Sequence, residues 1–131
     1  MSFITFLLTL PAIASSSAVL HLPEQPVPAD AQAIYNQPLA ETEHSSSFLL
    51  TINAPVPNHY HQRHTEQIYV LAGSARMRLG HEELDIRAGD YLLIPPGTVH
   101  GVLAITSLEP LKVLSIQSPR FDPSDRVLVD D

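Results

Sequence analysis

The chain of 131 residues contains no cysteine, no tryptophan and a single lysine, Lys112. The absence of cysteine excludes disulfides and thiolate metal sites, so any metal ion must be held by histidine, aspartate or glutamate. Seven Lys and Arg residues against 14 Asp and Glu residues give a formal net charge of −7. No basic patch is visible, and we therefore expect neither nucleic acid nor an anionic membrane surface as a partner.

Glycine is also scarce, with five residues, whereas proline is abundant, with twelve. This balance favours many short strands with stiff connections over a helix bundle. The length suits one compact domain with a core of its own and is too short for two.

The N-terminal segment is apolar, since residues 3–18 read FITFLLTLPAIASSSA. A run of this length followed by small residues is typical of a signal peptide, and it is too short and interrupted to span a membrane. No Lys or Arg precedes it, so a hydrophobic N-terminal strand within residues 1–18 is the alternative. We expect a secreted or periplasmic protein, with a cytoplasmic one as the alternative.

Residues 19–46 are rich in proline, alanine, glutamine and serine and show no sustained apolar period. They predict an extended arm, with a short strand around residues 33–35. The barrel domain is predicted to cover residues 47–131. Short apolar runs punctuated by glycine and proline predict its strands, at residues 47–54, 66–73, 75–80, 82–90, 90–98, 100–105, 111–118 and 125–130. The pattern predicts an all-β, antiparallel sandwich or barrel.

Histidines and a glutamate crowd the stretch HYHQRHTEQIYVLAG, residues 59–73. Because side chains alternate along a strand, His59 and His61 face the same way. Glu66 begins the next strand on the face that holds Ile68 and Val70, and His100 heads a later strand. Three imidazoles and one carboxylate in this arrangement could bind one divalent ion and leave two coordination positions open.

This stretch resembles the first sequence motif of the cupin superfamily, which asks for His-x-His, then a glutamate, then a glycine. His59, His61, Glu66 and Gly73 occupy those positions. The second cupin motif is matched by Gly89, Pro95, Gly97 and His100 in GDYLLIPPGTVHGVLA.

The resemblance covers roughly residues 48–117 and departs from the family pattern at Ala104, where asparagine is usual. It implies a double-stranded β-helix (jelly-roll) barrel and a metal site formed by His59, His61, Glu66 and His100. The ion would be one divalent transition metal: Fe, Mn, Ni, Co or Zn. A hydrogen-bonded polar cluster without an ion is the alternative.

Glu66 is also a candidate catalytic base, and His64, which has no place in the family pattern, is a weaker catalytic candidate. Arg76 and Arg78 share a face opposite Met77, and we expect both arginines in solvent. The metal pocket would then be mostly apolar, lined by the following residues or their alternating neighbours: Phe48, Leu50, Ile68, Val70, Met77, Leu93, Val102 and Leu114.

Such a pocket suits a small, largely neutral substrate that chelates the metal. We expect a metal-dependent enzyme, with a dioxygenase as the best single hypothesis. A non-redox isomerase or lyase, or a non-catalytic module that binds a small ligand or metal, is the alternative. The family also commonly dimerises through a sheet edge, and a homodimer is expected here.

Overall fold

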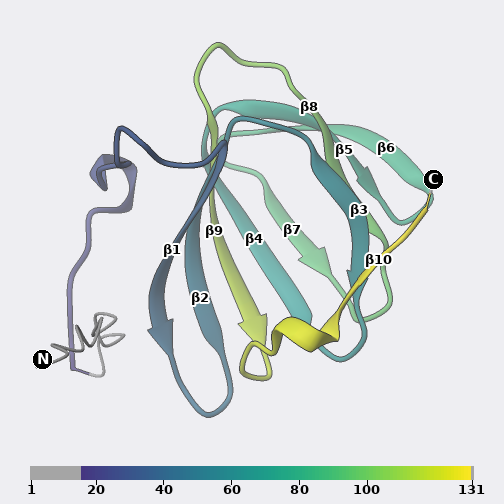
Figure 1. The fold of residues 1–131 in the computed structure, drawn as a ribbon, viewed down its shortest axis with the longest axis horizontal. Coiled ribbons are helices and arrows are strands. Elements are labelled where there is room, and N and C mark those ends of the chain that lie inside the picture. The colour runs from purple at the N-terminus through teal and green to yellow at the C-terminus, as the bar shows by residue number, and fades with distance from the viewer. Residues whose placement is uncertain (1–15, 131) are drawn as a thin grey trace, which may run out of the picture.

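The computed structural model describes residues 16–130, which form two facing β-sheets (Figure 1). Two short 3-10 helices flank or interrupt the strands, η1 (Leu22–Glu24) and η2 (Pro123–Asp125). The strands in chain order are β1 (Ile34–Glu41), β2 (Ser46–Ile52), β3 (Val56–His61), β4 (Thr65–Ala72), β5 (Ser74–Leu79), β6 (Glu82–Arg87), β7 (Tyr91–Ile94), β8 (His100–Ile105), β9 (Leu111–Ser118) and β10 (Arg126–Leu128).

The strands are ordered β1-β2-β9-β4-β7 in one sheet and β10-β3-β8-β5-β6 in the other. The pairings are antiparallel, and most neighbours are not consecutive in the sequence. The chain therefore passes repeatedly from one layer to the other, as in a jelly-roll barrel. This confirms the predicted all-β, antiparallel class.

Strand β9 shows how the sequence sets the interior, because its burial alternates along all eight residues. Leu111, Val113, Ser115 and Gln117 are buried, and their neighbours are partly exposed. Along one inward face the strand thus changes from apolar to polar. The apolar half joins the core, and the polar half reaches the histidine cluster described below.

The core lies between the two sheets and draws on both of them. Its buried members are aliphatic or small, as the pattern of short strands with apolar alternation predicts. They are Ile52, Val70, Ala75, Met77, Ile86, Leu92, Val102, Leu111 and Val113.

Strand β1, residues 34–41, extends the first sheet beyond the predicted start of the barrel at residue 47, and the short strand expected around residues 33–35 overlaps its beginning. Strand β1 pairs with β2 along its whole length, with a register shift at Pro38. An edge strand bonded on one side tolerates proline and polar residues, so its sequence gives a weak strand signal. The other side of β1 is a sheet edge at which the predicted homodimer could pair, and that assembly stays a prediction.

The predicted signal peptide or first strand lies almost entirely in residues 1–15, outside the described part of the chain. Within residues 16–130 no helix has the length and apolarity needed to cross a membrane.

Gly73 links β4 to β5 and has a φ of +79°, in the left-handed region that favours glycine. A Cβ at this position would collide with the backbone of Pro110 and Leu111. Gly89 also has a positive φ, +95°, but a Cβ there would meet open space. The two glycines therefore separate the effect of backbone conformation from that of close packing.

We expect Gly89→Ala to lower the free energy of unfolding by about 1–2 kcal/mol through backbone strain. Gly73→Ala should cost about 1–3 kcal/mol more, because the methyl group also overpacks the β4–β5 connection. Urea denaturation of both variants measures the difference. Equal losses would show that the Pro110 backbone does not crowd this position.

Candidate metal centre

Three histidines from neighbouring strands meet inside the barrel. His59 and His61 point to the same side of β3, and His100 at the start of β8 is paired directly opposite His59. The ring centroids of His59 and His100 are 4.3 Å apart, and His61 lies 5.3 and 5.4 Å from these two rings. All three side chains are buried, and each offers a nitrogen within 4.8 Å of the others.

Backbone carbonyls fix the proton on two of these rings. Nδ1 of His59 lies 2.8 Å from the carbonyl oxygen of Pro57, and Nδ1 of His100 lies 2.9 Å from that of Thr98. A carbonyl oxygen only accepts, so Nδ1 must donate in both cases. In the neutral rings Nε2 then carries the lone pair, which is the form that binds a metal.

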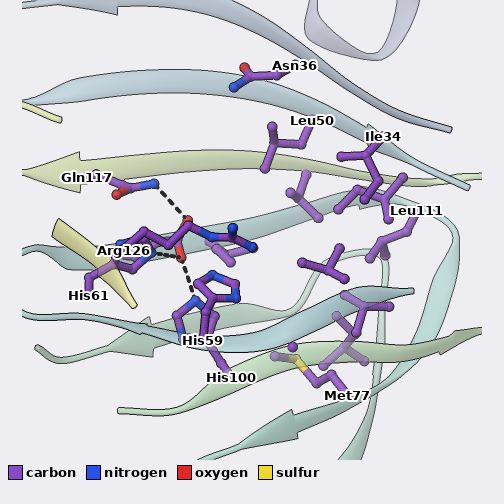
Figure 2. A pocket seen from close by; sticks show the side chains of 18 of the residues that line it. Ile34, Asn36, Leu50, His59, His61, Met77, His100, Leu111, Gln117 and Arg126 are labelled. Carbon is purple, nitrogen blue, oxygen red and sulfur yellow. Dashed lines mark hydrogen bonds and ion pairs between the residues drawn. The ribbon is translucent and has the colours of Figure 1, made fainter. Parts of the chain in front are cut away.

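Glu66 reaches the same point from β4 in the opposite sheet. Its Oε1 lies 3.1 Å from Nε2 of His100 and 3.6 Å from Nε2 of His61. Its Oε2 accepts hydrogen bonds from the Ser115 hydroxyl and, at 3.3 Å, from the Gln117 side-chain amide. Figure 2 shows the contacts of Glu66 with His61, His100 and Gln117 as dashed lines beside the cavity. The structure therefore brings all four predicted metal ligands together.

The contact between Glu66 and His100 requires a proton or a metal ion between the two atoms. Nδ1 of His100 already donates to Thr98, so its neutral ring would direct the Nε2 lone pair at a carboxylate oxygen. Two lone pairs at 3.1 Å repel, and Glu66 is only 5% exposed, so water does not screen them. Either a proton between the two atoms or a metal ion shared by both side chains satisfies the contact. The donor set fits a divalent transition metal.

The surroundings also favour the ligating forms of Glu66 and His59. Burial by itself raises the pKa of Glu66. Hydrogen bonds from His100 and His61, the charge of His100 and the Ser115 hydroxyl together outweigh this effect and hold the pKa well below its usual range. Burial and the neighbouring His100 lower the pKa of His59 to about 4, with smaller contributions from Arg126 and His61. Above that pH, His59 is a neutral donor and Glu66 an anionic one.

A cavity of about 310 Å³ opens onto the four residues. The cavity is open to solvent, and its lining includes the exposed residues Ile34 and Arg126. Its polar lining outside the cluster consists of Asn36, Gln117 and Arg126. The apolar lining is formed by Ile34, Leu50, Ile52, Val56, Ile68, Met77, Ile86, Val102, Leu111, Val113 and Phe121.

The predicted wall is correct in part. Leu50, Ile68, Met77 and Val102 line the cavity, whereas Leu93 is 53% exposed on the outer side of β7. On β9 the alternating neighbour Val113 lines the cavity in place of Leu114, and Val70 lies in the core. A shift of one residue along a strand exchanges the two faces, which accounts for Leu93 and Leu114, whereas Val70 does face inward but is packed within the core.

The two arginines predicted to face solvent do not line this cavity. Arg76 pairs with Asp85 at 3.3 Å on the sheet's outer side, and Arg78 lines a separate surface pocket with His81 and Glu83. Arg126, which the sequence did not single out, supplies the cavity's cation instead.

His64, predicted as a weaker catalytic candidate, is buried behind His61 and does not line the cavity. Its Nε2 donates to the carbonyl oxygen of Arg120 at 3.1 Å, and its Nδ1 lies 3.3 Å from Asp125. Asp125 also accepts hydrogen bonds from the backbone amides of Arg63 and His64. The geometry indicates a role in anchoring the β3–β4 turn to η2 and gives a catalytic role no support.

Comparison with known proteins identifies the family and similar chains. Residues 48–117 match the family model described as a cupin domain. An uncharacterized protein of Aquifex aeolicus is 36% identical over 92 residues, which cover 70% of this chain and 74% of that protein.

Two further matches concern an enzyme and a solved structure. The quercetin 2,3-dioxygenase of Bacillus subtilis is 40% identical over 45 residues, which cover 34% of this chain and only 13% of that enzyme. A solved structure from Klebsiella pneumoniae, an uncharacterized conserved protein with a double-stranded β-helix domain, has a TM-score of 0.73 at 21% identity. It covers 88% of this chain and 100% of its own, and at this identity the likeness concerns the fold alone.

The lowered pKa of His59 predicts a pH dependence of stability for protein stripped of metal by a chelator. From pH 6.5, the ordinary pKa, down to about 4, the unfolded chain binds a proton on His59 that the folded chain does not. The free energy of unfolding should therefore be fully retained above pH 6.5 and fall as the pH drops through this window.

Urea denaturation between pH 7.5 and 4 measures the effect. His59→Gln should flatten the pH dependence, whereas His44→Gln, which changes an exposed histidine, should leave it unchanged. The same slope in parent and His59→Gln would contradict the assignment.

Proposed function

The chain belongs to the cupin family, and from this premise we propose that it is a metal-dependent enzyme acting on a small molecule. One observation carries the proposal: three buried imidazoles and one buried carboxylate converge at the wall of a cavity that opens to solvent. A module that only stores or senses a metal needs no such space beside its ligands, so the cavity favours a protein that takes up a small molecule; a non-catalytic module that binds a small ligand stays the alternative.

His59, His61, Glu66 and His100 are the proposed ligands of one divalent ion: Fe, Mn, Ni, Co or Zn. When bound, such an ion polarises substrate oxygens and, if redox-active, couples them to O₂. The chain's own contribution is orientation. Carbonyls hold two of the imidazoles, and Ser115 and Gln117 hold one oxygen of the Glu66 carboxylate.

A dioxygenase is the reaction class that these residues support best. The described cavity lining contains no tyrosine and no lysine that could move a proton for an isomerase or lyase. The lowered pKa of Glu66 makes it a weak base near neutral pH, which also counts against proton abstraction. The partial match to a quercetin 2,3-dioxygenase supports the same class. The proposed substrate is a small compound that presents two oxygen donors to the metal and an apolar body to the wall.

Removal of one ligand tests the metal site. We expect His61→Ala to lower metal content by at least about tenfold while the fold survives. Loss of one ligand sharply reduces metal affinity, whereas loss of one side chain's packing reduces folding stability only modestly. Elemental analysis of purified protein measures the content, and circular dichroism checks the fold.

His44→Ala is the matched control, since His44 is an exposed histidine remote from the cavity lining. It should keep the parent's metal content. Equal content in parent and His61→Ala would remove the site assignment.

Oxygen uptake tests the reaction class. Protein loaded in turn with Fe(II), Mn(II), Co(II), Ni(II) or Zn(II) would be given a panel of small enols and vicinal diols, with quercetin included. We expect O₂ consumption in proportion to substrate loss with at least one redox-active metal, and none with zinc or with His61→Ala. Substrate conversion at an unchanged rate under argon would contradict a dioxygenase and favour the isomerase or lyase alternative.

A further inference from the structure

We propose that Arg126 binds a carboxylate group of the substrate, so that the cavity accepts organic acids with a compact apolar body. The inference deepens the proposed function, because it concerns the same cavity and names the class of compound that enters it. It replaces the expectation of a largely neutral substrate.

The position of Arg126 follows from strand register. Strand β10 pairs with β3 so that Arg126 is directly opposite His61 and Leu128 is opposite His59. Directly opposed residues share a face of the sheet, so Arg126 projects to the side that holds the metal ligands. Strand β10 is also the edge of its sheet, which explains how a residue on the inward face remains exposed to solvent.

Figure 2 shows the Arg126 side chain extending past the cluster, with its guanidinium on the cavity side, near the ring of His59. Its charge contributes to the lowered pKa of His59, which agrees with this proximity. The guanidinium therefore borders both the metal centre and the apolar part of the cavity.

Arg126 differs from Arg63, Arg76 and Arg120 in having no anionic partner within residues 16–130. Arg76 contacts Asp85, Arg63 contacts Asp122 and Asp125, and Arg120 contacts Glu41 at 2.7 Å. No hydrogen bond or ion pair of the Arg126 side chain occurs within residues 16–130. A guanidinium at a cavity rim that pairs with no carboxylate of residues 16–130 is available to an anion from solution.

The chemistry of the surroundings selects the kind of anion. A guanidinium presents two parallel N–H groups that match a carboxylate in bidentate fashion. A phosphate ester would need further cations, and Arg126 is the only Arg or Lys among the described lining residues. Beyond it the wall is apolar, with Met77 and Leu111 on the far side, so the rest of the ligand should be apolar.

A pair of probes of similar shape, one anionic and one neutral, tests the inference. 3-Phenylpropanoate and its neutral analogue 3-phenylpropanamide would be titrated into the full-length protein under argon, with binding followed by NMR. Arg126→Gln removes the proposed partner. Arg76→Gln is the matched control, because it removes the same charge from the outer side of the sheet.

We expect the parent and Arg76→Gln to bind the acid at least about tenfold more tightly than the amide, as a charge-assisted pair allows. Arg126→Gln should lose that preference while its affinity for the amide stays within about twofold. Equal affinities of acid and amide in the parent, no binding of either probe, or a preference that survives in Arg126→Gln would overturn the inference. Oxygen uptake is not measured, so failure of the proposed dioxygenase activity leaves this result unaffected.

Discussion

A buried carboxylate that faces imidazole nitrogens is the interaction on which the centre depends. Glu66 is almost fully removed from water, and its Oε1 lies close to Nε2 of both His100 and His61. Nδ1 of His100 donates to a backbone carbonyl. The contact between Nε2 of His100 and Oε1 of Glu66 is therefore satisfied only when a proton or a metal ion lies between these two atoms. A proton can satisfy this contact, but a metal ion can interact with all three histidines at once. The cluster is therefore costly without a cation and stabilised with one.

The two-layer fold makes this arrangement possible by contributing from both sheets. The histidines come from β3 and β8, whereas Glu66 and the two groups that hold it, Ser115 and Gln117, come from β4 and β9. The same inward faces continue as aliphatic side chains, so the polar centre and the apolar cavity are parts of one interior (Figure 2). The proposed metal site and the apolar wall proposed to contact the substrate thus lie on the same strands.

Much of the fold and of the cluster could be predicted from the sequence, because both depend on local spacing. Alternation places His59 and His61 on one face, and glycine and proline mark the strand ends. Features set by long-range register were missed. The sequence predicted only a short strand at residues 33–35, and the full extent of β1 follows from its pairing with β2. Arg126 becomes part of the cavity only because β10 pairs with β3, more than 60 residues earlier in the chain. The residues around Arg126 in the sequence give no indication that it lies beside the histidines of β3.

Anomalous X-ray diffraction from crystals of metal-loaded protein tests the central claim most directly. One anomalous peak should lie inside the barrel, bonded at about 2.0–2.2 Å to Nε2 of His59, His61 and His100 and to an oxygen of Glu66. A barrel interior without such a peak, or a peak that leaves Glu66 and His100 bonded only to each other, would contradict the account.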